Sequence, residues 1–373
     1  MARRPSDIIV VGAGVVGCAV AYELARRGAS VEIVDERPVG MGATQASAGV
    51  LAPYIEAREP GPLLDLTVRS LHLYDEFIAR VSAEGGVAVP YRRTGTLDIA
   101  TSDAELCALQ ARAELLARRD VPALVMDAAG VHSEEPYLGD GVIGGLLIET
   151  HGFVAASDLT RALVVAARRH GAQLIEQSPV RRIMRCDGDM VVETDRGSLT
   201  GNAVVLAAGS WSGEIAVDGV AVRVPVRPVR GQLLWLGWTG TPLRRVTWSS
   251  RCYVVPWEDG TLLVGATVEE AGFDERTTAA GVRDLLDAVC EIVPHAWTAG
   301  FRGARVGLRP ATNDALPAIG PSQAMPNLMY ATGHDRNGVL LAPLTAELVA
   351  DAMLDNRIDP MLAAVSPSRF GAL

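Results

Sequence analysis

The segment from Asp7 to Glu36 places the strongest constraint on the fold of this chain. The apolar run DIIVV at 7–11 predicts a buried strand, and the glycine-rich turn GAGVVG at 12–17 follows it directly. Helical spacing of apolar residues then runs to Gly28, and a second strand pattern leads to the acidic pair at the end of the segment. This strand–turn–helix–strand order predicts a dinucleotide-binding unit with a parallel sheet.

Each residue of this unit has a physical reason. Gly12 permits the tight turn, Gly14 lets the backbone approach a pyrophosphate, and Gly17 lets helix and strand pack closely. The helix N-terminus offers N–H groups and the positive end of a dipole to phosphates. Asp35 stands roughly 20 residues beyond the first glycine, where an acidic ribose ligand is expected. An acid there favours a free ribose 2′-hydroxyl, which predicts FAD or NAD rather than NADP.

The bulk composition limits the partners. The net charge of −10 argues against nucleic acid or an anionic membrane as the main partner. All basic residues are arginine, so neither a Schiff-base lysine nor a lysine base can act. Five widely spaced cysteines without a CxxC pair suit a reduced, cytoplasmic protein without a disulfide framework or a metal site. The apolar run 8–25 resembles a signal peptide or a membrane span, but glycines and Glu23 interrupt it.

Two later segments help to distinguish FAD from NAD. GATQASAGVLAP at 42–53 and NAVVLAAGSWS at 202–212 are rich in small residues, which allow the backbone to approach a cofactor closely. A single N-terminal NAD module would leave both segments unexplained, although each alone is also compatible with an ordinary tight loop.

The order of these segments resembles the glutathione-reductase-type flavoproteins, and more narrowly the glycine oxidase branch of the D-amino acid oxidase superfamily. The resemblance covers nearly the whole chain and is carried by GAGVVG, ATQASAG, PVRPVRGQLL, RCYVVPWEDGTLLVGAT, GLRPATNDALPAIG and GHDRNGVLLAP. It implies an α/β fold with a Rossmann-like FAD-binding domain and an interleaved antiparallel-sheet substrate domain. Gly307 stands about where sarcosine oxidase has its flavin-linking cysteine, which implies noncovalent FAD.

A coarse reading of the chain predicts two interleaved domains. The FAD-binding domain is discontinuous, at 1–86, 150–218 and 306–373, and the substrate-binding domain comprises 87–149 and 219–305.

Three local patterns support this layout. Residues 157–172 predict a crossover helix with Ser157 as N-cap and Gly171 near its C-cap. The β-rich stretches 87–101 and 219–268 predict one antiparallel sheet, with a hairpin at Glu258-Asp259-Gly260.

The sequence GHDRNGVLLAPLTAELVADAML near the C-terminus predicts a helix that starts between Asn337 and Pro343. Its N-terminus is a preformed anion site. In the resembled family this end abuts the flavin and stabilises the reduced ring, with the backbone of 334–340 lining it.

The resemblance also implies the residues that bind the substrate. Arg309 in GLRP stands where glycine oxidases place their substrate arginine, and a planar guanidinium binds a carboxylate bidentately. Tyr253 would hydrogen-bond the same carboxylate, and Arg336 matches a second substrate-contacting arginine. Taken without the family, Arg309 and Arg336 are equally compatible with surface ion pairs and Tyr253 with a core position.

The cofactor contacts implied by the family lie in six places along the chain. They are Gly12, Gly14, Val15, Val16 and Gly17 over the pyrophosphate; Asp35 and Glu36 near the ribose; Ala43, Thr44, Ala48, Gly49 and Val50 in the small-residue loop; Val180 and Gly209; and His334, Asp335, Arg336, Asn337, Gly338, Val339 and Leu340.

The implied activity is oxidation of glycine or another small amine or D-amino acid, with O2 giving hydrogen peroxide. The imine of glycine would feed thiazole formation in thiamine synthesis. Val50, Arg251, Val268 and Asp335 depart from the glycine oxidase pattern, and a roomier, more charged pocket would admit sarcosine, D-alanine or D-proline. An amine dehydrogenase, a flavin-binding sensor or RNA-modifying protein, and an NAD dehydrogenase remain alternatives, as does a homo-oligomer.

Overall fold

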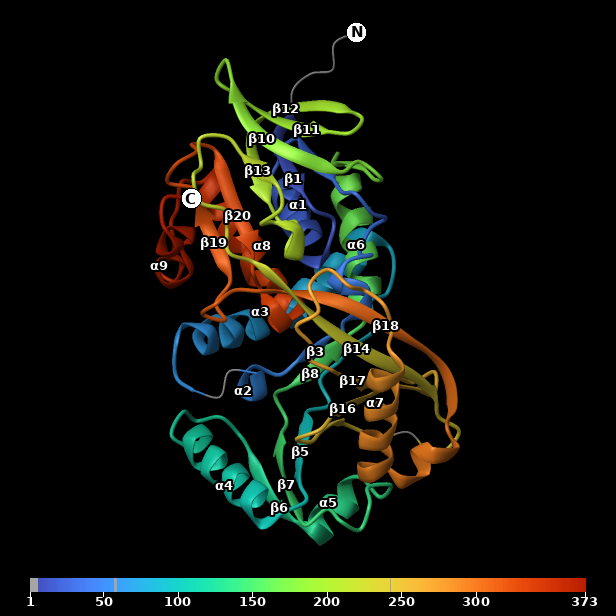
Figure 1. Ribbon diagram of the computed structural model, residues 1–373. Helices are drawn as coiled ribbons and strands as arrows, with labels where there is room; N and C mark the ends of the chain where they lie inside the picture. Colours follow the sequence, from blue (N-terminus) through green and yellow to red (C-terminus); the bar gives the residue numbers. More distant parts are fainter. Residues whose placement is uncertain (1–5, 57–58, 242) are drawn as a thin grey trace.

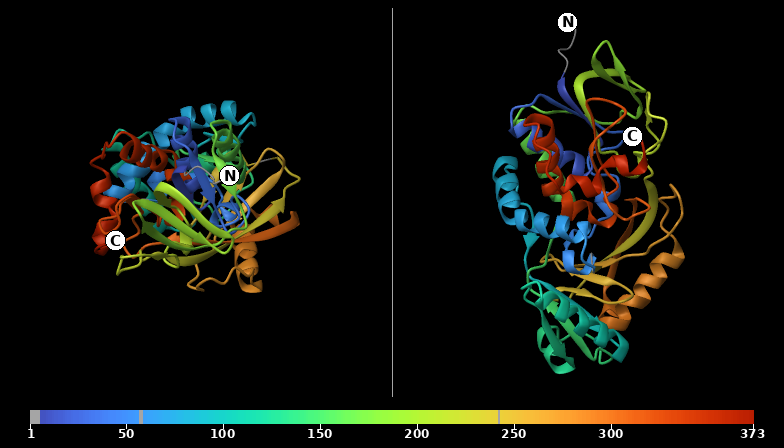
Figure 2. Two further views of the ribbon diagram at one scale, coloured as in Figure 1. Left: turned by 90° about the horizontal axis from the view of Figure 1, so that it is seen from above. Right: turned by 90° about the vertical axis from the view of Figure 1, so that its left-hand side faces the viewer.

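The computed structural model describes residues 6–56, 59–241 and 243–373. The chain forms two lobes stacked along one long axis (Figure 1), the upper built on a nine-stranded sheet and the lower on an eight-stranded sheet. Figure 2 shows from the side that the C-terminal helices pack on the upper lobe. The fold class predicted from the sequence is confirmed.

The upper sheet has a parallel core in the order β9–β2–β1–β12–β20. β11 continues β12 as an antiparallel neighbour, β10 pairs with β11, and β19 pairs with β20. The strands are β1 (Ser6–Val11), β2 (Val31–Val34), β9 (Gln173–Ile175), β10 (Val180–Cys186), β11 (Asp189–Thr194), β12 (Gly197–Leu206), β13 (Ala216–Val217), β19 (Ala318–Pro321) and β20 (Leu328–Thr332).

Four helices on one side of this sheet share its largest apolar core, with α3 packed against α6 and α8. They are α1 (Val15–Arg26), α3 (Pro62–Gly85), α6 (Ala156–Arg169) and α8 (Gly338–Leu354). On the opposite face, the parallel core strands share an apolar cluster with side chains of β10, β11 and the segment 215–226. The apolar run 8–25 therefore lies in β1 and α1, inside this folded core.

Helix α8 starts within the range predicted for it. Together with the preceding turn, Asp335–Leu354 is long and apolar enough to cross a membrane by length and composition, but 72% of it is buried in this fold. It packs against α1 and α3, and a helix that is apolar on all sides is typical of such a core position.

The crossover helix was predicted with one error. It appears as α6, but its N-cap is Ala155 rather than Ser157. Ala155 has an extended conformation and its N–H donates to the carbonyl of Pro90, so the helix starts two residues earlier than a Ser157 N-cap would give.

The lower sheet runs in the order β18–β14–β17–β16–β15–β5–β7–β6 and unites both β-rich stretches, as predicted. The predicted hairpin is β16–β17. One expectation is wrong, because β15 and β5 are parallel. These strands come from distant parts of the chain, so no hairpin turn imposes an antiparallel direction.

The strands of the lower sheet are β5 (Thr96–Ala100), β6 (Leu124–Asp127), β7 (Gly144–Ile148), β14 (Arg227–Gly237), β15 (Val246–Trp248), β16 (Tyr253–Pro256), β17 (Thr261–Gly265) and β18 (Gly300–Ala311). A small sheet between the lobes contains β3 (Val50–Leu51), β4 (Tyr91–Arg92) and β8 (Gly152–Val154). The remaining helices are α2 (Pro53–Glu56), α4 (Asp103–Ala117), α5 (Ala128–Glu134), α7 (Ala279–Ile292) and α9 (Leu362–Val365).

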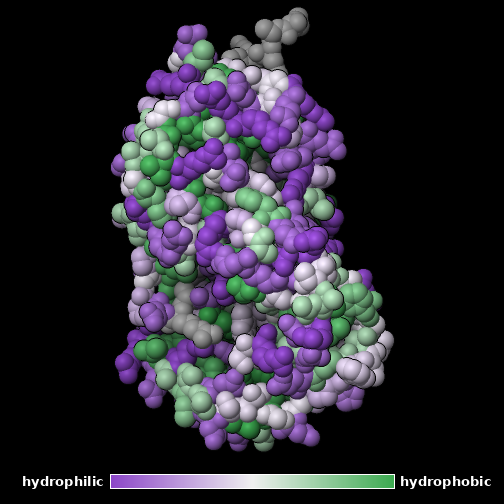
Figure 3. Space-filling view, viewed as in Figure 1, coloured by the Kyte–Doolittle hydropathy of each residue, from purple (hydrophilic) through white to green (hydrophobic). Residues whose placement is uncertain are grey.

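Strand β18 connects the two lobes. It begins in the lower sheet and its last residues lie beside the upper lobe, so it passes through residue 306, where the sequence analysis sets a domain boundary. The division into two domains stays a prediction. On the face drawn in Figure 3, hydrophilic side chains are interspersed with apolar ones over both lobes.

Candidate active site

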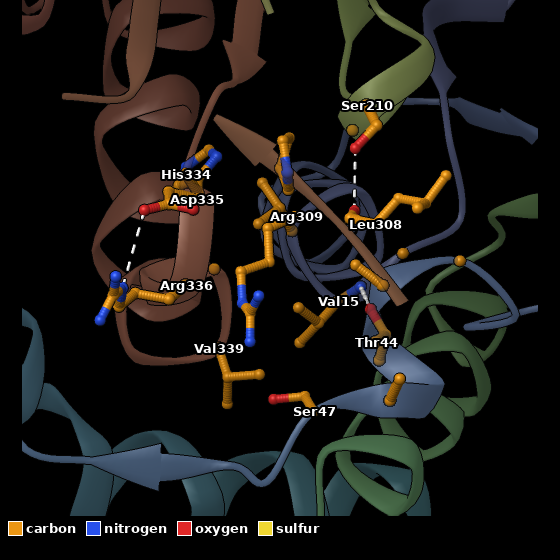
Figure 4. A pocket seen from close by; sticks show the side chains of 18 of the residues that line it. Val15, Thr44, Ser47, Ser210, Leu308, Arg309, His334, Asp335, Arg336 and Val339 are labelled. Carbon is orange, nitrogen blue, oxygen red and sulfur yellow. Dashed lines mark hydrogen bonds and ion pairs between the residues drawn. The ribbon is translucent and has the colours of Figure 1, made fainter. Parts of the chain in front are cut away.

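A cavity of about 670 Å³ lies between the two lobes. Its walls come from the β1–α1 turn, the loop 42–50, the end of β12, the strands β16 and β18, and the segment that leads into α8. Figure 4 shows labelled side chains from the β1–α1 turn, the loop 42–50, β18 and the segment before α8 around one space. The cavity has two ends with different chemistry, one built mainly of backbone and the other of charged side chains.

Three glycines shape the backbone end. Gly12 has a φ of +112°, and a Cβ there would overlap the carbonyl of Ala207. A Cβ on Gly17 would overlap the carbonyl of Gly12, so this glycine permits close packing of helix on strand. Gly14 is the N-cap of α1 and lines the cavity itself. Thr44 Oγ1 accepts the Val15 N–H at 3.0 Å, which ties the small-residue loop to the helix start.

Asp35 fixes the glycine turn in addition to lining the cavity. Its Oδ2 accepts the Ala13 N–H at 2.6 Å and its Oδ1 accepts the Arg37 N–H at 2.7 Å. Burial raises the pKa of this carboxyl, while the two backbone hydrogen bonds oppose that shift. A carboxylate has about four lone-pair positions, so both oxygens retain acceptor capacity for a ribose hydroxyl.

Most residues predicted to bind the cofactor lie in the cavity wall, and two do not. Gly17 packs helix against strand, and Leu340 is 1% exposed in the core with its carbonyl accepting the Ser70 hydroxyl. Those in the wall are Gly12, Gly14, Val15, Val16, Asp35, Glu36, Ala43, Thr44, Ala48, Gly49, Val50, Val180, Gly209, His334, Asp335, Arg336, Asn337, Gly338 and Val339.

The start of α8 closes one side of the cavity. Gly338 and Val339 line it, and the hydroxyl of Tyr74 on α3 donates to the Val339 carbonyl. His334 is 3% exposed and its Nε2 lies 3.1 Å from Thr345 Oγ1. Burial lowers the pKa of His334 to about 3, so this imidazole is neutral at physiological pH. His334 therefore adds no charge to the positive end of the helix in this wall.

Arg309 projects from β18 into the charged end of the cavity (Figure 4). Its Nη1 donates to the carbonyl of Thr267 at 3.0 Å and to that of Arg230 at 3.4 Å. The guanidinium lies over Gly231 of β14, where a Cβ would come within 2.5 Å of Nη2. A glycine at 231 therefore leaves the space that this side chain occupies.

Tyr253 on β16 likewise lies over a glycine of the adjacent strand, β17. A Cβ on Gly265 of β17 would come within 2.5 Å of the tyrosine oxygen. The ring of Tyr253 packs against Trp248 with centroids 4.8 Å apart. Burial raises its pKa to about 12, although the positive charge of Arg309 opposes the shift. The hydroxyl thus stays protonated and can donate a hydrogen bond.

Arg336 faces two carboxylates. Its Nε lies 3.4 Å from Glu56 Oε2 and 3.7 Å from Asp335 Oδ2, the latter drawn in Figure 4. Sequence reasoning missed Glu56, which ends the four-residue helix α2 and lines the cavity. The one sequence feature that could have indicated Glu56 is its position just after the small-residue loop. Burial raises its pKa to about 7, helped by Asp335 and opposed by Arg336 and Arg309.

The donors and acceptors of the cavity fit FAD. Asn337 Oδ1, at the α8 N-cap, is buried and accepts no hydrogen bond from the described part of the chain. It can accept an N–H from a heterocyclic ring, while the glycine turn and the α1 N-terminus suit phosphates. Gly49 has a φ of +68° and packs against the backbone of Val154, which shapes the loop between these two ends.

Comparison with known proteins agrees with this reading. The chain is 34% identical over 368 residues to the bifunctional protein ThiO/ThiG of Nostoc sp., covering 97% of this chain and 55% of that one. It thus spans about half the length of the first curated relatives it matches. The crystal structure of glycine oxidase from Geobacillus kaustophilus is 32% identical with a TM-score of 0.93, covering 98% of this chain and 99% of that one.

A third comparison is with iminodiacetate oxidase from Chelativorans sp. BNC1, which is 27% identical with a TM-score of 0.88 and covers 96% of this chain and 98% of that one. The model of the DAO family, described as FAD dependent oxidoreductase, matches residues 7–352. On that match, the chain belongs to the DAO family of FAD-dependent oxidoreductases.

Proposed function

We propose that this protein oxidises glycine, or another small amine that carries a carboxylate, and passes the electrons to O2. The observation that carries the proposal is that Arg309 and Tyr253 line the same cavity as the start of α8, with the Arg309 charge acting on the Tyr253 hydroxyl. Further support comes from relatives named glycine oxidase, one of them from Geobacillus kaustophilus with 33% identity and 92% of each chain covered.

Arg309 binds the substrate carboxylate in this mechanism. The carbonyls of Thr267 and Arg230 hold the guanidinium in place, so its fork is oriented before substrate arrives. Tyr253 donates its hydroxyl proton to the same carboxylate, because its raised pKa keeps the proton on the oxygen. Two fixed donors on one carboxylate define the direction of the Cα–H bond.

When bound, FAD supplies the acceptor for a hydride and, through O2, the route to hydrogen peroxide. The residues proposed to hold it are the glycine turn and Asp35 at one end and the segment 334–339 at the other. The positive end of α8 stabilises negative charge that develops beside it. Loss of a hydride from Cα and of a proton from the nitrogen of neutral-amine glycine would leave an imine, which water converts to glyoxylate and ammonia.

We further propose that the imine serves thiazole formation, as the relative named ThiO/ThiG suggests. Val50 and Val268 line the cavity, and both are smaller than the methionine that can occur at these positions in the family. The cavity is wider there and could admit amines larger than glycine. Sarcosine, D-alanine and D-proline are the amines that a wider cavity would add. We also propose noncovalent attachment of FAD, because Gly307 offers no thiol.

A peroxide-coupled screen of glycine, sarcosine, D-alanine and D-proline tests the proposal. Arg309→Ala should raise KM by about 100-fold or more for carboxylate-bearing amines, with unchanged flavin content, because a charge-assisted bidentate contact is lost. Arg302→Ala, on the same strand but exposed, is the matched control. An unchanged KM would remove Arg309 from the site, and dye reduction without peroxide would indicate a dehydrogenase.

A further inference from the structure

We propose that Glu56 sets the charge selectivity of the substrate end, by holding Arg336 in an ion pair that excludes amines with a second carboxylate. The inference rests on the proposed function, since it concerns which carboxylate-bearing amines enter the same cavity. The family resemblance assigns Arg336 to the substrate. The contacts of this chain instead engage that guanidinium with the protein's own carboxylates.

The two side chains of the ion pair differ in their exposure to solvent. The Glu56 side chain is 12% exposed, whereas that of Arg336 is 50% exposed. Glu56 sits at the end of α2 and Arg336 in the turn before α8, so the pair joins two separate walls of the cavity. A buried carboxylate without a cation is strongly unfavourable, and Arg336 is the cation nearest to it by the contacts of the described residues. The side chain of Arg336 is thus drawn toward Glu56.

The contact is nevertheless loose. The 3.4 Å separation is that of an ion pair, and Glu56 Oε2 is buried with no hydrogen-bond partner in the described part of the chain. A bidentate arginine–carboxylate pair would use two short N–H···O bonds instead. Arg336 therefore retains donors that another carboxylate could use, provided that the charge of Glu56 did not oppose it.

The proposed selection against a second substrate carboxylate follows from the charged side chains at this end of the cavity. Arg309 and Arg336 face two carboxylates, Glu56 and Asp335, at this end of the cavity. A third arginine of the lining, Arg251, is paired with Glu291 instead. The carboxylate of a simple amino acid binds at Arg309. A second substrate carboxylate would have to reach Arg336 beside Glu56, where like charges repel in a partly desolvated space. Removing the Glu56 charge leaves Arg336 free to bind it.

The test uses calorimetric titration of the flavin-loaded protein with acetate and malonate, which carry one and two carboxylates. Glu56→Gln should lower the ratio of malonate Kd to acetate Kd by about tenfold or more, since a carboxylate gains a charge-assisted contact. Glu59→Gln, an exposed residue three positions along, is the matched control and should leave the ratio unchanged. In turnover, Glu56→Gln should raise kcat/KM for iminodiacetate relative to glycine by a similar factor.

Two further variants make the result specific. Adding Arg336→Gln to Glu56→Gln should abolish the gain, and Arg336→Gln alone should raise the malonate-to-acetate ratio, because the Glu56 carboxylate then stands without its cation. An unchanged ratio in Glu56→Gln with full flavin content would overturn the proposal, as would a gain that persists in the double variant. Failure of the proposed function would appear differently, as wild-type protein that binds acetate but oxidises none of the amines.

Discussion

The two ends of the cavity are built in different ways. The dinucleotide end is formed mainly by one contiguous segment of backbone, with Gly12 and Gly14 in one turn and Asp35 directly after the next strand, β2. At the substrate end, Glu56, Tyr253 and Arg309 come from α2, β16 and β18, which are far apart in the sequence. The first end is specified by local conformation, and the second by the assembly of the whole chain.

The two ends should also differ in how substitutions affect stability and binding. At the dinucleotide end, a Cβ on Gly12 or Gly49 would overlap the backbone of Ala207 or Val154, which cannot move aside. At the substrate end, a Cβ on Gly231 meets the flexible end of the Arg309 side chain. Substitutions at the dinucleotide end should therefore reduce both the stability of the fold and the binding of the cofactor. Substitutions at the substrate end should reduce substrate recognition alone.

The largest expected effect is that of Gly12→Ala. The substitution combines a φ of +112° with overlap against the Ala207 carbonyl, so we expect destabilisation of about 3 kcal/mol or more and loss of bound flavin. Flavin absorbance and thermal unfolding of the purified variant measure both effects.

Gly28→Ala is the matched control for that substitution. Gly28 has a similar φ of +97°, but no atom lies within 4 Å of a Cβ there. We expect a loss of about 1 kcal/mol with flavin retained. Equal damage in both variants would mean that positive φ alone, and not close packing at the strand, explains the role of Gly12.

An intermediate effect is expected for Gly231→Ala at the substrate end. The new methyl group would displace the Arg309 guanidinium, which should raise KM for glycine by about tenfold or more while flavin content stays normal. Gly300→Ala, at the start of β18 with open space around it, should leave KM unchanged. A variant that lost its flavin would show that the two ends are less separate than their construction suggests.

The same contrast explains what the sequence could predict. The glycine turn, α1 and Asp35 follow from a local pattern, and α8 follows from apolar spacing with a glycine at its start. The positions of Arg309 and Tyr253 in the cavity wall were reached only through family resemblance. No periodicity in GLRP or RCYVVPW indicates which way those side chains point.

Glu56 was missed because nothing local distinguishes it. It ends a four-residue helix, too short for a periodic pattern, and its partner Arg336 is distant in sequence. The parallel pairing of β15 with β5 was missed for a related reason, because the direction of strands without a shared turn is decided by the whole sheet. Long-range juxtaposition, rather than propensity, separates the predicted features from the missed ones.

The smallest expected effect is a pH dependence confined to the substrate end. Burial raises the pKa of Glu56 from its ordinary 4.5 to about 7, so the carboxyl is mostly charged at pH 8 and mostly neutral at pH 6. The charged groups that face it are Arg336, Asp335 and Arg309, and Tyr253 stays protonated throughout because its pKa is about 12.

As the pH falls from 8 to 6, loss of the Glu56 charge should free Arg336 and lower the malonate-to-acetate Kd ratio of the wild type by a few-fold. Titration of the ligands themselves contributes equally to every variant, so Glu56→Gln provides the baseline. The wild-type ratio should approach that baseline at pH 6 and depart from it at pH 8. Parallel profiles for the two proteins would place the selectivity elsewhere, whereas converging profiles would assign it to one carboxyl that the local sequence does not reveal.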